Sequence, residues 1–228
     1  MRVGVTTEIK VHEYRVGLTP SAVREYVARG HQVMVQSGAG AGIMATDEAY
    51  KKAGAKIVKT AEEIFAKADM IVKVKEPQAA ERKMLREGQI LYTYLHLAPD
   101  PEQTKDLVKS GAICIAYETV TSARGGLPLL APMSQVAGRM SVQCGAHSLE
   151  KAQGGRGVLL GGVPGVAPAK VVILGGGVVG TNPAAIAPGM GADVTILEKS
   201  TDRMEELVAR FGTQLKTIYS TQGAVEDE

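Results

Sequence analysis

A glycine-rich turn between an apolar strand and a helix-like segment constrains this sequence most. The stretch VVILGGGVVG places Gly175, Gly177 and Gly180 in the spacing Gly-x-Gly-x-x-Gly. In a dinucleotide-binding unit the first glycine permits the tight turn, the second lets the backbone approach a pyrophosphate, and the third lets helix and strand pack closely. The pattern therefore predicts a Rossmann-type unit, although a glycine-tight strand-helix-strand unit without a ligand would look the same.

An acidic residue ends the next apolar strand and strengthens that prediction. Glu198 follows Gly180 by 18 residues. An acid at this position accepts hydrogen bonds from the adenosine ribose hydroxyls and repels the 2′-phosphate of NADP. We therefore expect NAD as the cofactor, by tenfold or more over NADP. Arg203 can pair with Glu206 on its own helix surface, so we expect it to soften that repulsion little.

Two prolines interrupt the helix that should follow the glycine turn. An interior proline loses a backbone hydrogen bond and clashes with the preceding turn, at a cost of about 3 kcal/mol. Pro183 and Pro188 therefore predict a helix that is kinked or begins late. The sequence also stops about 30 residues after Glu198, so the second sheet is expected to be incomplete.

Strand-like and helix-like segments alternate through the first half of the chain. This alternation predicts an α/β fold with a mostly parallel sheet, and the glycine-turn unit adds a second, so we expect two Rossmann-like parallel-sheet domains. A polar, glycine-containing break runs from Glu118 to Pro132, and a long helical pattern follows it. We place the domain boundary near residue 130, which gives domains at 1–130 and 131–228. The acidic tail TQGAVEDE offers little to pack and is expected to fray.

Three basic residues stand where predicted strands of the first domain end. Arg15 follows the first strand, Lys75 ends MIVKVK, and His96 ends ILYTYLH. Such residues meet at one rim of a parallel sheet, where open α/β sheets bind ligands. An arginine suits a carboxylate, a lysine supplies a point charge, and a histidine can transfer a proton. Taken singly, each fits a surface, strand-edge or capping role better than a role in a site.

The overall composition excludes several classes of protein. Lys and Arg number 26 against 24 Asp and Glu, a balance that does not favour nucleic-acid or membrane binding. No apolar run approaches the ~20 residues that span a bilayer, so we expect a cytoplasmic protein. Cys114 and Cys144 are isolated in apolar contexts and are expected to be buried free thiols. No spacing of residues indicates a metal site.

At these residues the chain resembles a known family. The motifs that carry the resemblance are EYRVGLTP, QSGAGAG, VKVKEP, YLHLAPD, IAYETV, LPLLAPMSQVAGRM, GGRGVLLGGVPGV and VVILGGGVVGTN, in that order from Met1 to about Ser220. They are similar to those of alanine dehydrogenases and, more distantly, to the soluble nucleotide-binding subunit of proton-translocating nicotinamide nucleotide transhydrogenase. KVKEP, LHLA and APMSQVAGR fit the alanine enzymes better.

The resemblance implies roles for the residues of the first domain. Arg15 would bind the substrate carboxylate, Lys75 would hold and polarise pyruvate or alanine, and His96 would be the acid/base group. The implied reaction is the reversible NAD-dependent oxidative deamination of L-alanine to pyruvate and ammonium. The first domain would then be the substrate domain, and the family implies a homo-oligomer, a hexamer.

The resemblance also implies a set of cofactor contacts in the partial NAD-binding domain. Those residues are Ser134, Gly175, Gly177, Gly180, Glu198, Arg203 and Ser220. Glu198 stands where the family usually has aspartate. Family members run well beyond 228 residues, which implies truncation within this domain. Three hypotheses follow: an alanine dehydrogenase, a transhydrogenase-like or non-catalytic nucleotide-binding fragment, and a structural fragment completed by a partner chain.

Overall fold

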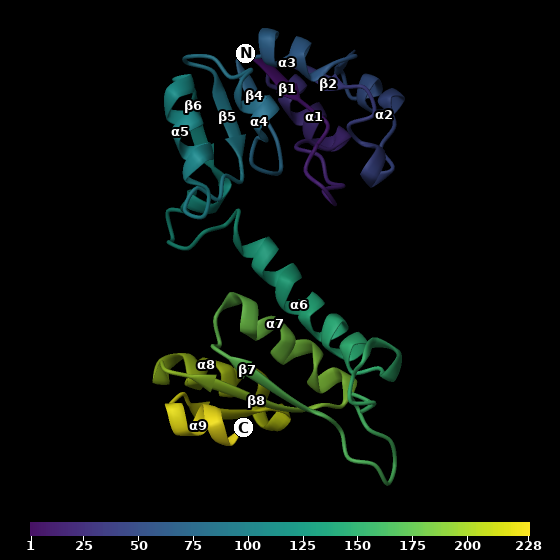
Figure 1. The fold of residues 1–228 in the computed structure, drawn as a ribbon, viewed down its shortest axis with the longest axis vertical. Helices are drawn as coiled ribbons and strands as arrows, with labels where there is room; N and C mark the ends of the chain where they lie inside the picture. Colours follow the sequence, from purple (N-terminus) through teal and green to yellow (C-terminus); the bar gives the residue numbers. More distant parts are fainter. The chain divides into compact units, whose positions relative to one another are not determined.

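The computed structural model describes residues 1–228, which form two compact units, Met1–Leu127 and Pro128–Glu228. Both units are α/β, and every strand pairing in their two sheets is parallel (Figure 1). The expected fold class is therefore confirmed. The second sheet has three strands against six in the first.

The sheet of the first unit has the strand order β3-β2-β1-β4-β5-β6. Its strands are β1 (Arg2–Val5), β2 (Gln32–Gln36), β3 (Lys56–Val58), β4 (Met70–Val72), β5 (Ile90–Thr93) and β6 (Ile113–Ala116). The chain builds the sheet outward from β1 in one direction and then returns to build it outward in the other. The direction changes between β1 and β4, which is the topological switch point where sheets of this kind bind ligands.

Helices cover both faces of the first sheet. They are α1 (Pro20–Ala28), α2 (Asp47–Lys52), α3 (Ala61–Lys67), α4 (Ala79–Arg82) and α5 (Pro101–Ser110), with short 3-10 helices η1 (Ala41–Ile43) and η2 (Tyr117–Thr119). Successive strand residues point to opposite faces, so Val33 and Val35 pack in one core cluster and Met34 in the other. The first cluster contains Val23 of α1, and the second contains Phe65 of α3.

The second unit begins with α6 (Ala131–Ser148), which packs along α7 (Val178–Ile186) (Figure 1). Its sheet runs β7-β8-β9, with β7 (Lys170–Leu174), β8 (Asp193–Glu198) and β9 (Lys216–Tyr219). The remaining elements are η3 (Lys151–Gln153), η4 (Pro188–Met190), α8 (Thr201–Phe211), η5 (Gly212–Gln214) and α9 (Gln222–Asp227). No helix of the chain is both long enough and apolar enough to cross a membrane.

The prolines interrupt α7 but do not delay its start. Of the two alternatives expected, a kink or a late start, the late start is wrong, because the helix begins at Val178, directly after the glycine turn. Pro183 lies inside the helix, and the α-helix ends at Ile186 before the 3-10 turn that Pro188 begins. Pro183 leaves the Val179 carbonyl without its helical donor, because a proline nitrogen carries no hydrogen.

Gly138 of α6 approaches that unpaired carbonyl. A Cβ atom at Gly138 would lie 2.3 Å from the Val179 oxygen, 2.8 Å from the Asn182 Cβ and 3.0 Å from the Pro183 Cδ. Only glycine therefore allows this approach, in which a Cα–H can face the carbonyl. Arg139 donates from Nε to the Asn182 side-chain oxygen at 3.0 Å and ties the same two helices together.

Two further expectations were wrong. The acidic tail is not frayed, because Thr221 accepts a hydrogen bond from the Ala224 N–H and caps α9. Both cysteines are free, but Cys144 is exposed and Cys114 is only half-buried. An apolar sequence context on α6 did not imply burial at position 144.

Candidate functional site

The first candidate site lies where β1, β4 and β5 of the first unit end. Arg15 lies in the loop between β1 and α1, Lys75 follows β4 by three residues, and His96 follows β5 by three residues. Since β1 and β4 are neighbours and β4 pairs with β5, all three residues belong to the carboxyl-terminal rim of adjacent parallel strands. This is the rim at the switch point.

The Arg15 guanidinium is held by Glu13. Nε of Arg15 donates to Oε1 of Glu13 at 2.8 Å, and Nη2 donates to Oε2 at 2.6 Å. These hydrogen bonds lower the pKa of the Glu13 carboxyl and raise the pKa of Arg15. The charge of Lys75 also lowers the pKa of Glu13, so the structure brings Lys75 into the field of the same carboxylate. Unlike Arg15, the Lys75 ammonium makes no hydrogen bond or ion pair within the chain.

His96 adopts a backbone conformation that is uncommon for residues other than glycine and that His12 and Met44 of this chain share. Its φ of 49° is left-handed, a strained region that is concentrated at functional sites. The Glu118 carboxylate stabilises this turn by accepting the His96 N–H at 2.7 Å and the Leu95 N–H at 3.0 Å. The His96 ring stacks on Tyr94 with 6.0 Å between centroids. Burial raises the pKa of the Tyr94 phenol and the positive charge of Arg15 opposes that rise, so the ring on which His96 stacks lies in the field of Arg15.

A buried ion cluster lies beneath this rim. The Lys73 side chain has no exposed surface, and its Nζ lies 3.0 Å from a Glu8 oxygen and 2.7 Å from a Glu81 oxygen. The second Glu8 oxygen accepts the Val74 N–H at 2.6 Å, and Glu81 accepts the Gln78 N–H at 2.8 Å. Glu8 comes from the loop that carries Arg15, whereas Lys73 directly follows β4 and precedes Lys75 by two residues. The cluster therefore fastens the loop that carries Arg15 to the segment that carries Lys75.

Glycines complete the attachment of the Arg15 loop. A Cβ at Gly17 would lie 2.4 Å from the Val72 oxygen, and a Cβ at Gly42 would lie 2.1 Å from the Tyr14 oxygen. The loop backbone thus touches β4 on one side and the glycine run of residues 38–42 on the other. That run supports the segment on which Arg15 lies, because Gly42 lies directly against the Tyr14 backbone.

The second candidate site is the glycine turn of the second unit. Gly175 has a φ of 88°, and a Cβ at Gly180 would lie 1.9 Å from the Gly175 oxygen, so both positions require glycine. Gly177 is the N-cap of α7, makes no side-chain cap bond and has open space beside its Cα. The first N–H groups of a helix lack partners within it and favour an anion. The turn can therefore accept a phosphate group.

Glu198 and Arg203 hold the peptide of Gly176 from its two ends. Glu198 accepts the Gly176 N–H at 2.6 Å on one oxygen and the Lys199 and Ser200 N–H groups at 2.7 and 3.0 Å on the other. The three backbone donors lower the pKa of Glu198, those of Ser200 and Gly176 most strongly. Arg203 donates to the Gly176 oxygen at 2.6 Å and to Thr181 Oγ1 at 2.8 Å, and it also pairs with Glu206.

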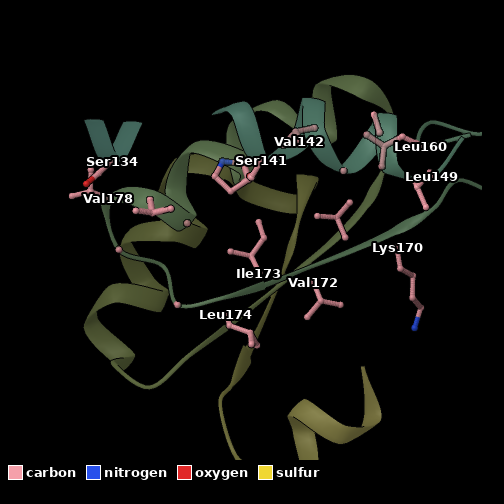
Figure 2. Close-up of a pocket in the computed structure, with 18 residues that line it drawn as sticks. Ser134, Ser141, Val142, Leu149, Leu160, Lys170, Val172, Ile173, Leu174 and Val178 are labelled. Atoms are coloured by element: carbon pink, nitrogen blue, oxygen red, sulfur yellow. The ribbon is translucent and has the colours of Figure 1, made fainter. Parts of the chain in front are cut away.

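The remaining cofactor candidates lie around the same turn. Ser134, in the first turn of α6, lines a cavity of about 810 Å³ together with Gly175, Gly177 and Gly180 (Figure 2). Ser220 follows β9, and its N–H donates to the Glu198 carbonyl at 2.9 Å. The structure thus brings all seven predicted residues of the second unit to one end of its sheet.

The cavity itself is mostly apolar and extends along β7 away from the turn. In Figure 2, Ser134 and Val178 lie toward one end and Lys170 toward the other. β7 is an edge strand with a neighbour, β8, on one side only. Ala169 and Gly175 form backbone hydrogen bonds toward β8. Because alternate residues of a strand direct their backbone groups to opposite sides, the backbone groups of Lys170, Val172 and Leu174 point away from β8. The end near the glycine turn offers the backbone N–H groups that start α7, whereas the rest is a mostly apolar groove between α6 and the edge of β7, with Lys170 at its far end.

Several residues at the first site were not predicted from the sequence. Glu8, Glu13, Lys73, Glu81 and Glu118 are all charged groups that hold other groups in place. Two weak signals existed: Glu13 stands two residues before Arg15, and a lysine inside an apolar strand pattern, as in IVKVK, demands a partner. No group of three or more His, Cys, Asp or Glu side chains comes together as a metal site would require.

Comparison with known proteins places this chain in a family. The N-terminal domain of the family described as "Alanine dehydrogenase/PNT" matches residues 4–137, and its C-terminal domain matches residues 141–228. An alanine dehydrogenase of Halomonas elongata is 57% identical over 100% of this chain and 61% of the relative. The chain thus spans about three fifths of the length of that relative.

Solved structures agree with the sequence match. An L-alanine dehydrogenase superposes with a TM-score of 0.94 at 50% identity, covering 100% of this chain and 63% of the other. A transhydrogenase from Sinorhizobium meliloti superposes with a TM-score of 0.83 at 26% identity, covering 100% and 66%. From the order of its strands, the residues at their rims and these matches over its whole length, the chain belongs to the alanine dehydrogenase/PNT family.

Proposed function

We propose that this chain carries the substrate site and the phosphate-binding half of the cofactor site of an NAD-dependent alanine dehydrogenase. The reaction is the reversible oxidative deamination of L-alanine to pyruvate and ammonium. The observation that carries the proposal is the convergence of Arg15, Lys75 and His96 on the rim at the switch point of the first sheet. The alanine dehydrogenases among its relatives support the same reaction.

Each residue of the rim has a chemical part in this proposal. Arg15 binds the substrate carboxylate through a planar fork of N–H donors. Lys75, whose ammonium lies in the field of Glu13 without a hydrogen bond to it, places a positive charge against the carbonyl oxygen of pyruvate. His96 transfers the proton at the reacting carbon's heteroatom, for which an imidazole is suited near neutral pH.

The second unit fits an NAD molecule at its glycine turn. The uncapped start of α7 and the open space beside Gly177 would take the pyrophosphate, with Ser134 at the same end of the cavity. Three of the roughly four lone-pair positions of Glu198 are used by backbone N–H groups, which leaves one for a ribose hydroxyl. Arg203 and Ser220 border the ribose and adenine side. Bound NAD supplies the hydride acceptor.

The alternative is a nucleotide-binding module without chemistry, as in a transhydrogenase-like subunit. The similarity to the transhydrogenase structure favours it, since that similarity also covers the whole chain. This alternative function also uses the phosphate site of the second unit, but it needs no histidine that transfers a proton. We further propose that the protein acts in the cytoplasm and as a homo-oligomer, a hexamer as the family resemblance implies.

The decisive experiment measures alanine-dependent formation of NADH by the purified chain, and in parallel the binding of ADP and pyruvate. Formation of NADH that His96→Ala abolishes supports the dehydrogenase. ADP binding without pyruvate binding or NADH formation supports the nucleotide-binding module. The variant Gly177→Glu, which places a carboxylate at the start of α7, is expected to abolish ADP binding while leaving pyruvate binding intact.

A further inference from the structure

The feature that carries the inference is the fork between Glu13 and Arg15. Oε1 of Glu13 accepts both the backbone N–H of Arg15 at 2.9 Å and its Nε–H at 2.8 Å, while Oε2 accepts from Nη2 at 2.6 Å. Three hydrogen bonds thus fix one carboxylate to one arginine within a loop. The Glu13 side chain is 7% exposed and that of Arg15 is 47% exposed.

A guanidinium has five N–H donors in a plane, and the fork with Glu13 uses two of them. The edge formed by Nε and Nη2 is therefore occupied. The edge formed by Nη1 and Nη2 keeps one donor on Nη2 and both on Nη1, which suffices for a second carboxylate bound through two parallel hydrogen bonds. The occupied edge faces the buried partner, so the unoccupied edge belongs to the exposed half of the side chain.

We propose that Glu13 is a positioning residue, which holds Arg15 by one edge and presents the opposite edge to the carboxylate of the substrate. The inference rests on the proposed function, in which Arg15 binds that carboxylate. Glu13 itself does not touch substrate. It remains bound to Arg15 when the substrate arrives, so the two carboxylates share one guanidinium.

The backbone beneath the fork is held rigidly enough for this role. Tyr14, between the two residues, contacts Gly42 so closely that any side chain at position 42 would collide with its carbonyl. Glu8, earlier in the same loop, is fastened to Lys73 and to the Val74 N–H. A long side chain that must be ordered on binding weakens a complex by about two- to tenfold, and Glu13 removes that cost from Arg15.

The first measurement requires no substrate. In a ¹⁵N-labelled sample of the whole chain, the Nε–H of Arg15, assigned by its loss in Arg15→Lys, is expected to exchange slowly with water. Glu13→Ala should make that exchange fast, whereas Glu48→Gln, a charge-neutralising change at an exposed ion pair of the same unit, should leave it slow. Fast exchange of Arg15 Nε–H in the unsubstituted chain would overturn the proposal.

The second measurement adds pyruvate. The Arg15 Nε–H resonance is expected to remain protected and nearly unshifted at saturation, while the dissociation constant rises about two- to tenfold in Glu13→Gln and in Glu13→Ala. Loss of Nε–H protection on adding pyruvate would show that substrate displaces Glu13, which overturns the shared guanidinium. An unchanged dissociation constant in both variants would overturn the positioning role.

The two measurements separate this inference from the proposed function. If pyruvate fails to bind, the proposed substrate is wrong, and the presentation of Arg15 to a substrate carboxylate is overturned with it. Slow exchange that depends on Glu13 would then still establish the fork as a structural contact. If pyruvate binds and Arg15→Lys does not weaken it, the carboxylate site lies elsewhere and the inference fails while the substrate stands.

Discussion

The two sheets of this chain differ in how completely the strands beside their candidate sites are buried. In the first unit the central strands β1 and β4 have neighbours on both sides and packed residues on both faces, and the switch point lies between them. In the second unit the strand that leads into the glycine turn, β7, is an edge strand, with Val172 38% and Leu174 67% exposed. Parallel strands are ordinarily buried on both faces.

The difference extends to how each unit holds its polar groups. The rim of the first unit is organised by carboxylates with little exposed surface, Glu8, Glu13 and Glu81, each paired with a cation. The turn of the second unit is organised by glycine backbone, with Glu198 and Arg203 bound to a peptide group. The stability of the first unit is thus expected to fall when a buried charge is removed, and the stability of the second when a side chain is added to a glycine of the turn.

The largest effect is expected from Lys73→Met in the first unit. It leaves Glu8 and Glu81 buried without their shared cation, and breaking a buried pair in this way costs about 3–5 kcal/mol. Hydrogen exchange of β1 amides should accelerate while that of β8 amides does not. Lys51→Met, which breaks an exposed pair with Glu48, is the control and should cost under about 0.5 kcal/mol. A loss below about 1 kcal/mol for Lys73→Met would mean that the cluster does not hold the rim.

The next effect is expected from Gly180→Ala in the second unit. Its Cβ would lie 1.9 Å from the Gly175 oxygen, and such overpacking costs about 1–3 kcal/mol. Hydrogen exchange should now accelerate in β8 and not in β1. Gly177→Ala, three residues away with open space around its Cα, should cost no more than about 1 kcal/mol as an N-cap change. Equal destabilisation by both would contradict the close turn.

A smaller effect concerns cofactor choice. Glu198 should favour NAD over NADP by about tenfold, which corresponds to about 1.4 kcal/mol, and Glu198→Gln should remove that preference. Because the Ser200 and Gly176 N–H groups lower its pKa, the carboxylate stays charged across neutral pH, and its contribution to the preference should be lost only below the ordinary range of a glutamate. Glu206→Gln, which removes an exposed partner of Arg203, should leave the ratio unchanged in a titration of NAD and NADP.

The smallest effect on stability is expected from Leu174→Thr on the edge strand. Leu174 is 67% exposed, so the free energy of unfolding should change by less than about 0.5 kcal/mol. Association between chains should nevertheless fall, because an apolar edge strand pairs readily with other chains. Light scattering against concentration measures it. Val108→Thr, at a 78% exposed position on helix α5, offers no free backbone and should leave association unchanged.

The parts of the fold that follow from local pattern could be predicted from the sequence. Alternating strands and helices gave the α/β class, and the glycine spacing located the turn at Gly175 to Gly180. The requirement for glycine at 175 and 180 is a property of neighbouring backbone atoms, so it shows in the local sequence. The roles assigned to Arg15, Lys75 and His96 remain predictions.

The parts that depend on contacts between distant segments could not be predicted. Lys73 lies 65 residues from Glu8, and Glu118 lies 22 residues from His96, so no local spacing joins either pair. Pro183 appears damaging to α7 in the sequence because the residue that compensates for it is also distant. Its cost inside α7 was visible in the sequence, whereas the glycine of α6 that meets the freed carbonyl is more than 40 residues away.

The contact of Gly138 with the Val179 carbonyl also sets a length scale. Sliding α6 along α7 by one helical turn, about 5.4 Å, would bring a residue with a side chain against that oxygen, because the positions one turn away are Ser134, Gln135, Ser141 and Val142. The helix pair therefore has one permitted alignment. Ser134 lies one turn before Gly138, so this alignment places it at the end of the cavity where the glycine turn lies. Pro183 weakens α7, but the carbonyl that it frees fixes the alignment of α6 and, with it, the position of Ser134.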